Sequence, residues 1–280
     1  MSIAPAMEDN DHECFPYGLS KTTPTYEYQN AAHYSAVLSR QLDRLRLHQD
    51  TSDYVIFTNI NQEQLSRDFQ ESTDWPFESY FPRLQVLLTK LETDIHANAA
   101  RKFEFALLRK LSAMNGLDKQ LDLPGAALVK TPERSKKADN SYKPHHGPKY
   151  RNKKWPTLAV EVAYSESWRK LANDARWWLA ASNGDIKTII TISINQKYRE
   201  ITCDKWGLNA EEEPVALYRV QMQRDAGCEH VKISNKDPLI IRFEDLFLRP
   251  SQDACDGDVV FSQDDLKELA SMIWRVQFDE

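Results

Sequence analysis

Residues 155–184, WPTLAVEVAYSESWRKLANDARWWLAASNG, contain the two patterns on which the expected fold depends. The first is an alternation from 157 to 163, in which every second residue is a branched apolar one. Because successive side chains of a strand point to opposite faces, this segment predicts a β-strand with one apolar face. The other face carries small residues and a single carboxylate, that of Glu161. Such a strand is typical of a cleft wall that holds a chemical group.

The second pattern has the period of a helix and follows the strand directly. Apolar residues in 168–182 recur every three to four positions, which predicts a helix with one buried face. Ser165 or Ser167 is expected to cap its N-terminus. Asn183 and Gly184 tolerate the left-handed conformation, so the helix is expected to end there.

The composition is that of an ordinary globular protein, with 280 residues, 28% charged and 41% hydrophobic. No apolar run approaches the roughly 20 residues that a membrane helix needs. The acidic start, MSIAPAMEDNDHECF, lacks the basic and apolar regions of a signal peptide. We therefore expect an intracellular protein, in the nucleus or the cytoplasm, with no membrane partner.

Several kinds of site are not expected because their motifs are missing. The four cysteines are scattered without a CxxC spacing, which argues against a zinc site and a disulfide framework. None of the GxxxxGK(S/T), GxGxxG or GxSxG motifs occurs. His145 and His146 lie in a proline-flanked segment without a third ligand, so we expect them at the surface.

Positive charge is concentrated in residues 130–154. This segment contains nine Lys or Arg residues and two acids, whereas the whole chain has a formal net charge of -6. A basic segment on an acidic body favours a polyanionic ligand such as DNA or RNA. A solvated loop without a ligand explains the same charges. Six residues are the candidates for contacts to nucleic-acid phosphates: Lys136, Lys137, Lys149, Arg151, Lys153 and Lys154.

The chain divides into three parts. Residues 1–24 contain three prolines and little periodic apolar content, which predicts a disordered tail. Residues 25–82 are expected to form a helical extension, with its main helix from 26 to 48 and a surface that is a candidate for binding a protein partner. Residues 83–280 are expected to form the core.

Strand and helix patterns alternate along the core, which predicts an α/β or α+β fold with a mixed central sheet and flanking helices. The first core strand is expected at 83–91. A long helix is expected at 94–114, capped by Asp94 and with His96 on its buried face. The other core elements expected are strands at 140–143, 186–194, 198–206, 215–223, 231–234 and 239–242, and helices at 243–248 and 263–276. Within the extension, a short strand is expected at 55–58 and a short helix at 62–69.

Asp139 and Glu161 are the pair in which we expect chemistry. Each lies on or beside a predicted strand, and a loop separates them. Two carboxylates on adjacent strands can hold Mg²⁺ or Mn²⁺, which keeps water and phosphate at its remaining positions and lowers the pKa of the bound water. Plainer interpretations stay open: Asp139 as a turn residue, and Glu161 as a solvated group or as the partner of Arg169 or Arg176.

The run SKKADNSYKP at 135–144, followed by WPTLAVEVAYSES and by LANDARWWL, resembles the PD-(D/E)XK restriction-endonuclease-like superfamily, in particular its uncharacterised fungal members. The resemblance covers about residues 84–206 and is most specific from 156 to 178. It implies a restriction-endonuclease-like core and a metal-dependent nuclease. Carried over by position, Asp139 matches the metal-binding aspartate and Glu161 the acid of the second motif. The Val162 carbonyl is expected to bind the metal ion with them.

One departure from the superfamily pattern concerns the lysine that assists the attacking water. Ala163 stands at its position, so whether the chain is an enzyme stays open. Lys170, in the first turn of the next helix, is slightly favoured as its replacement over Lys143, although a solvated helix lysine fits Lys170 as well. Glu104 is the candidate for a helix glutamate that assists metal binding.

Two functions are therefore expected. The first is a metal-dependent phosphodiesterase that acts on nucleic acid, with Asp139, Glu161 and Lys170 as catalytic residues. The second, which Ala163 motivates, is a catalytically degenerate module of the same fold that binds nucleic acid or a protein partner without turnover.

Overall fold

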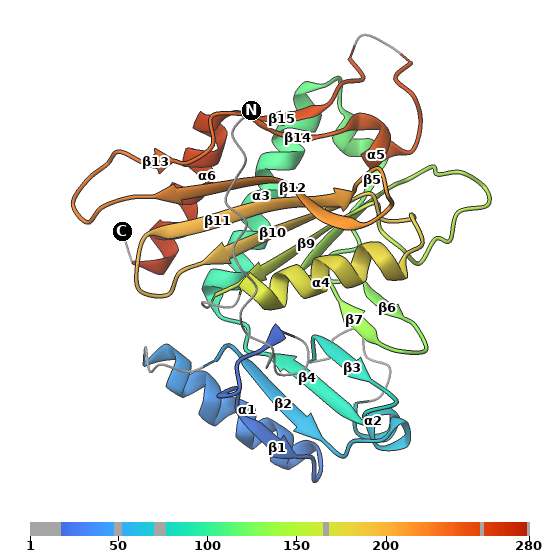
Figure 1. Ribbon diagram of the computed structural model, residues 1–280, viewed down its shortest axis with the longest axis vertical. Coiled ribbons are helices and arrows are strands. Elements are labelled where there is room, and N and C mark those ends of the chain that lie inside the picture. Colours follow the sequence, from blue (N-terminus) through green and yellow to red (C-terminus); the bar gives the residue numbers. More distant parts are fainter. Residues whose placement is uncertain (1–17, 48–51, 70–76, 165–167, 253–254, 279–280) are drawn as a thin grey trace.

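The computed structural model describes residues 18–47, 52–69, 77–164, 168–252 and 255–278. They form a mixed α/β fold with flanking helices, as the alternating patterns predict. Figure 1 shows a smaller N-terminal layer below a larger core. Among the described helices, none has the length and apolar composition needed to span a bilayer.

The core is built on a seven-stranded sheet in the order β13-β12-β11-β10-β9-β8-β5. The central pair, β9 and β10, is parallel, and the neighbouring pairs are antiparallel, so the sheet is mixed. A two-stranded ribbon, β14-β15, packs beside it. These strands are β5 (Leu121–Asp122), β8 (Asn140–Pro144), β9 (Leu158–Ala163), β10 (Thr188–Ile194), β11 (Glu200–Leu208), β12 (Pro214–Gln223), β13 (Lys232–Ile233), β14 (Leu239–Ile241) and β15 (Val259–Phe261).

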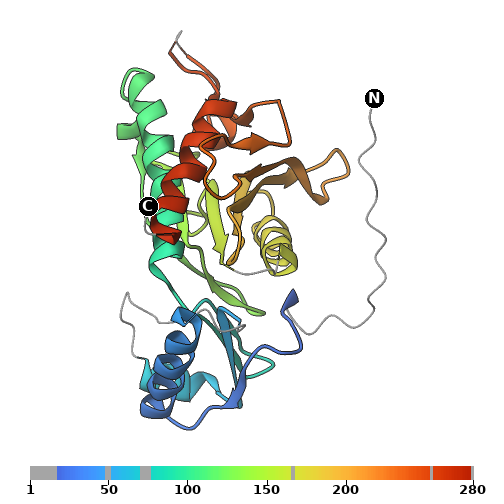
Figure 2. The same cartoon turned by 90° about the vertical axis from the view of Figure 1, so that its left-hand side faces the viewer.

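Helices cover both faces of this sheet, and the alternation in β9 explains why. Val160 and Val162 belong to the cluster packed by α3 and α6, whereas Ala159 belongs to the cluster packed by α4. Figure 2 shows α3 and α6 side by side, with α4 on the opposite side of the sheet. The core helices are α3 (Asp94–Ala113), η2 (Leu117–Gln120), α4 (Trp168–Ala181), α5 (Phe243–Phe247) and α6 (Gln263–Gln277).

The N-terminal layer is a second mixed sheet, in the order β1-β2-β4-β3-β7-β6. Helix α1 packs on it through Tyr34, Val37 and Leu45. Its elements are β1 (Thr25–Glu27), α1 (Ala31–Arg46), β2 (Tyr54–Thr58), α2 (Gln62–Asp68), β3 (Ser79–Phe81), β4 (Val86–Lys90), β6 (Leu128–Lys130) and β7 (Ser135–Lys137).

This layer differs from the helical extension expected at 25–82, because β1 and β3 join the expected strand at 55–58, which is β2, and the two helices. The strand expected at 83–91 as the first of the core is β4, and it pairs with β2 and β3 instead. Its residues are apolar on both sides, so the sequence could not say which sheet buries it. Most of the expected tail, 1–17, lies outside the described residues.

The local sequence signals predict the C-terminal end of α4 correctly and its start less well. Asn183 and Gly184 have φ values of 50° and 82°, as expected for the end of the helix. The expected caps, Ser165 and Ser167, lie outside the described residues. Trp168, the first apolar residue of the pattern that predicts the buried face of this helix, is 42% exposed. The cap of α3 is Thr93, one residue before the expected Asp94.

Candidate functional site

Asp139 and Lys90 meet where the two sheets adjoin. Asp139 directly precedes β8, and Lys90 is the last residue of β4. The Lys90 ammonium donates to Asp139 Oδ2 and to the Val162 carbonyl oxygen, each at 2.5 Å. The Val162 amide donates to the same Asp139 oxygen at 2.6 Å. An ammonium of the chain therefore lies between the Asp139 carboxylate and the Val162 carbonyl, two of the groups predicted to hold a divalent ion.

Asp139 and Lys90 stabilise each other's charged form. Burial acts to raise the pKa of Asp139, but the Lys90 ammonium and the Val162 amide hold it below its ordinary value. Burial acts to lower the pKa of Lys90, but the charges of Asp139 and Glu161 raise it instead. The Lys90 side chain is 4% exposed and that of Asp139 is 18% exposed. Asp139 is thus the member of the pair that a ligand can reach.

A cleft of about 680 Å³ opens over Asp139. One wall comes from α1 and the end of β4, and the other comes from α3 and residues 123–126. Glu104 on α3 lines the cleft and accepts a hydrogen bond from Asn140 Nδ2 at 2.8 Å. Asp139, Asn140 and Glu104 therefore surround one opening, between the N-terminal layer and the core.

Glu161 contacts different partners because it lies on the α4 face of β9. Its Oε1 accepts a hydrogen bond from Trp178 Nε1 at 2.5 Å and lies 3.2 Å from Lys136 Nζ. Burial raises the pKa of Glu161 to about 7; Lys136 opposes this shift, and Asp139 adds to it. Asp139 and Glu161 are close enough to affect each other's titration, but each has its own ammonium partner.

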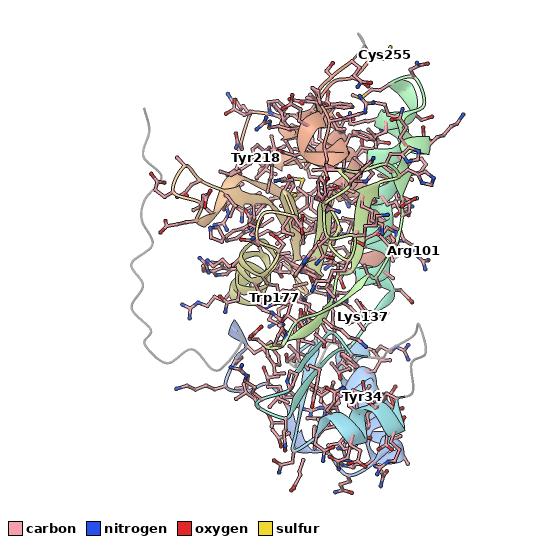
Figure 3. All side chains as sticks on the ribbon, turned by 90° about the vertical axis from the view of Figure 1, so that its right-hand side faces the viewer. Tyr34, Arg101, Lys137, Trp177, Tyr218 and Cys255 are labelled. Atoms are coloured by element: carbon pink, nitrogen blue, oxygen red, sulfur yellow. The ribbon has the colours of Figure 1, made fainter. Side chains whose placement is uncertain are left out.

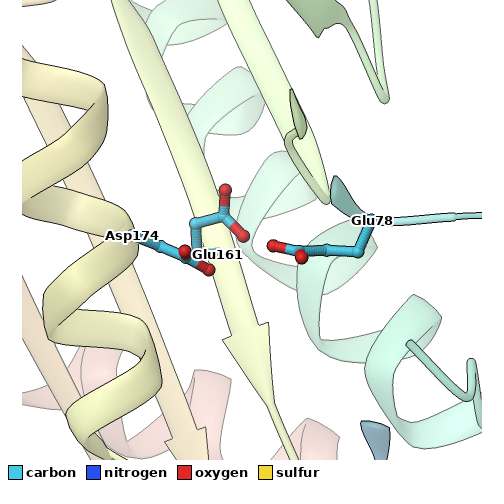
Figure 4. A group of neighbouring side chains, drawn as sticks. All are labelled: Glu78, Glu161 and Asp174. Carbon is cyan, nitrogen blue, oxygen red and sulfur yellow. The ribbon is translucent and has the colours of Figure 1, made fainter. Parts of the chain in front are cut away.

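Glu161 belongs to a second group of charges, buried between the two sheets. Glu78, just before β3, and Asp174, on α4, bring their carboxylates to it (Figure 4). One oxygen of each acid lies within 4.8 Å of the other two. Three cations accompany the acids, and we call the whole group the buried ion cluster: Glu78, Glu161, Asp174, Arg134, Lys136 and Lys170.

Each acid of the buried ion cluster has a cationic partner. Lys136 contacts all three acids, at 3.0 Å from Asp174 and 3.2 Å from Glu161, and it also bonds Glu78. Lys170 bonds Asp174 and lies 3.0 Å from Glu78. Arg134 lies 2.7 Å from Asp174. No side chain of the cluster is more than 6% exposed.

The electrostatics of this cluster favour two charged acids and one that accepts a proton. Burial acts to raise the pKa of Asp174, but Lys136, Lys170 and Arg134 hold it well below its ordinary value. The pKa of Glu78 is lowered by Lys136 and Lys170, also against the effect of burial. Glu161, with the fewest cationic contacts, is the acid whose pKa rises.

The buried ion cluster fits a network of salt bridges better than a catalytic metal site. Carboxylate oxygens are the donors that Mg²⁺ prefers, so the three acids by themselves suit an ion. However, three cationic side chains already neutralise them. A catalytic Mg²⁺ also keeps positions for water and substrate, whereas the three acids are at most 4% exposed, although Glu78 borders the cleft. We therefore interpret the cluster as the joint between the N-terminal layer and the core.

One of the solved structures that resemble the chain matches it at low similarity. It is a protein of Anabaena variabilis ATCC 29413, described as "a putative nuclease belonging to DUF820". Its sequence identity is 10% and the TM-score is 0.40, over 76% of this chain and 99% of that one. No protein-family model matches the sequence, and no curated protein matches it. A similarity at this level gives no argument about activity, and nothing supports a specific likeness to fungal proteins.

The two lysines considered as replacements for the motif lysine do not line the cleft. Lys170 is fully buried in the ion cluster, and Lys143 donates to a main-chain carbonyl at 3.5 Å. The lysine that contacts Asp139 is Lys90, which sequence reasoning missed. A weak signal was present, because a lysine at the end of the apolar strand VLLTK is buried only when it has a partner.

The six residues predicted to contact phosphates lie in different environments. Lys136 is fully buried in the ion cluster, and Lys137 lines the cleft. Arg151 donates to two main-chain carbonyls at 3.0 Å each, and Lys154 donates to another at 3.2 Å. The remaining two are exposed: Lys149 and Lys153.

Two histidines lie where the sequence predicts. His96 is 3% exposed, and its Nε2 lies 3.2 Å from Asp53 Oδ2, so it is a core residue with a partner. His145 is at the surface, 2.6 Å from an oxygen of Asp122. Neither histidine belongs to a group of potential metal ligands among the described residues.

Proposed function

We propose that the chain is a metal-dependent phosphodiesterase of the restriction-endonuclease-like type, acting on nucleic acid at the cleft over Asp139. The observation that carries this proposal is that the Asp139 carboxylate and the Val162 carbonyl converge on one point, where the Lys90 ammonium lies. Oxygen atoms that stabilise one positive charge there have the right chemistry for Mg²⁺ or Mn²⁺. Glu104 adds a second carboxylate at the same cleft.

The roles of the residues follow from this arrangement. Asp139 and the Val162 carbonyl would hold the ion, with Glu104 assisting from α3. The ion would polarise the phosphoryl group and lower the pKa of a bound water. Lys90 is the candidate for the relocated lysine; once displaced from Asp139, its ammonium would remain close enough to offset negative charge on the phosphate. Glu161 supports the site from the opposite face of β9, where Trp178 fixes its carboxyl group.

The test is cleavage of fluorescein-labelled DNA and RNA oligonucleotides with Mg²⁺, with Mn²⁺ and with EDTA. Cleavage should need the metal and should fall at least about 100-fold in Asp139→Asn, since that change removes one charge from the ion's site. A matched control is Asp264→Asn, whose side chain is 93% exposed on α6. Equal cleavage by Asp139→Asn and wild type would contradict the proposal.

A degenerate module of the same fold is the second candidate, and two specific observations favour it. Ala163 replaces the motif lysine, and the ion's position is filled by Lys90. This candidate binds nucleic acid with an affinity that falls as salt rises, but without turnover. Calorimetric titration with Mn²⁺ separates the two, because a site closed by Lys90 should take up no ion. A protein partner that binds the exposed face of α1 is the remaining proposal from the sequence.

A further inference from the structure

The cleft over Asp139 is a recessed site between two layers. Leu38 and Leu42 of α1 form part of one wall, and Arg101 of α3 lies on the other. Its volume, about 680 Å³, is in the range of pockets that enclose a small ligand, roughly 300–1,000 Å³. Figure 3 shows Arg101 on the core side and Lys137 at the junction of the two layers. A ligand must therefore enter between the layers to reach Asp139.

The walls of the cleft combine an apolar surface with a small number of charges. The apolar side chains are Leu38, Leu42, Phe77, Leu91 and Leu123. Leu123 is 46% exposed, so it presents its surface to a ligand rather than to the core. An apolar wall of this kind suits the flat face of an unpaired base, which proteins hold between apolar or aromatic side chains.

The charges at the cleft can bind only a small number of phosphate groups. Among the charged residues that line it, Glu78 and Lys90 are buried. The cations that keep some exposure are Arg101 and Lys137, and the acids that do are Glu92, Glu104 and Asp139. Binding of duplex DNA without base contacts depends on many Lys or Arg contacts to phosphates. Two cations beside three acids cannot supply those contacts, and a bound metal ion would be needed to offset the acids.

We propose that the cleft binds a single-stranded segment of nucleic acid, with one unpaired base against Leu42 and Leu123 and its phosphate near Arg101. This inference rests on the proposed function, because it places another phosphate of the same strand, the scissile one, at Asp139. In a duplex the bases are paired and stacked, so the apolar wall would have no base to contact unless one were extruded. An already single-stranded base avoids that unfavourable step.

The test measures fluorescence anisotropy of a labelled 12-nucleotide single strand and of its duplex, with the full chain and Ca²⁺ in place of Mg²⁺. We expect the single strand to bind at least tenfold more tightly. Leu123→Asp should weaken single-strand binding about tenfold and leave duplex binding unchanged. Leu84→Asp is the matched control, because Leu84 is 60% exposed and does not line the cleft. Arg101→Gln should lower the slope of log K against log salt by about 1.

The outcomes separate this inference from the proposed function. Three results would overturn the single-strand inference. The duplex could bind as tightly as the single strand, Leu123→Asp and Leu84→Asp could have equal effects, or neither the single strand nor the duplex could bind. Metal-dependent cleavage of duplexes that Asp139→Asn abolishes would still support a phosphodiesterase. Selective single-strand binding without any cleavage would overturn the phosphodiesterase and support the binding site.

Discussion

The buried ion cluster and the Asp139–Lys90 pair both join the N-terminal layer to the core with opposite charges, but they differ in access. Side chains of the cluster are at most 6% exposed, whereas Asp139 keeps 18% of its surface at the cleft. In the cluster, each carboxylate is enclosed by cations of the chain. At Asp139, the single ammonium partner is buried, and the carboxylate itself faces the cleft. Similar side chains thus join the layers in one place and, in our proposal, bind a ligand in the other.

This difference has an energetic basis. A buried charge that loses its partner is strongly destabilising, because neither water nor another group compensates it. A charge that faces a cleft can exchange its partner for water or a ligand. Substitutions in the cluster should therefore change stability, and substitutions at the cleft should change binding and cleavage.

The largest effect is expected for Asp174→Ala, which leaves three cations of the cluster without their shared acid. Breaking a buried ion pair in this way costs about 3–5 kcal/mol of unfolding free energy, measured by urea denaturation. Asp264→Ala, at a 93% exposed position, should cost less than about 0.5 kcal/mol. A loss for Asp174→Ala as small as that of the control would show that the cluster does not hold the layers together.

The next effect concerns the pH dependence of stability that Glu161 gives. Its pKa is raised from 4.5 to about 7 in the folded chain, so the folded state binds a proton that the unfolded state releases between these values. Stability should fall as pH rises from 4.5 to 7, by on the order of 3 kcal/mol. Glu161→Gln, which cannot release a proton, should remove this fall.

Glu78 and Asp174 do not hide this dependence on pH. Their lowered pKa values give stability that is lost only as pH falls below the ordinary carboxyl range. Urea denaturation at a series of pH values between 4.5 and 8 is the measurement. An unchanged profile in Glu161→Gln would mean that Glu161 is charged in the folded chain, like its two neighbours.

A smaller effect is expected at the cleft for Lys90→Met. Without the ammonium, a divalent ion no longer has to displace a bound cation from Asp139 and Val162. Mn²⁺ should bind about tenfold more tightly, a difference of about 1.4 kcal/mol, as measured by calorimetry. Cleavage should fall at the same time, because Lys90 is the proposed relocated lysine. Weaker Mn²⁺ binding in the variant would argue that Lys90 positions Asp139 for the ion instead.

The smallest effect is expected outside both groups, at the exposed Lys153. If the basic segment contacts phosphates, Lys153→Gln should weaken binding of all sequences equally and lower the salt slope by about 1. Anisotropy titrations at 50 and 200 mM salt measure it. An unchanged affinity and salt slope would mean that Lys153 does not contact phosphates, and that binding depends on the residues of the cleft.

The sequence by itself determined the local structure around the central strand and helix. The alternation at 157–163 predicted β9, and the residues Asn183 and Gly184 predicted the end of α4. Period, turn chemistry and apolar spacing act over a few residues, so they can be read directly from the chain. The α/β class followed from the same signals.

Only the tertiary structure decided which charges meet. Lys90 and Asp139 are separated by 49 positions in the sequence, and Glu78 and Lys170 by 92. No local pattern specifies such contacts, because they depend on how two sheets pack against each other. The sequence named Asp139 and Glu161 as a pair, and the packing of β4 and β7 against the core gave each a separate cation, Lys90 for Asp139 and Lys136 for Glu161.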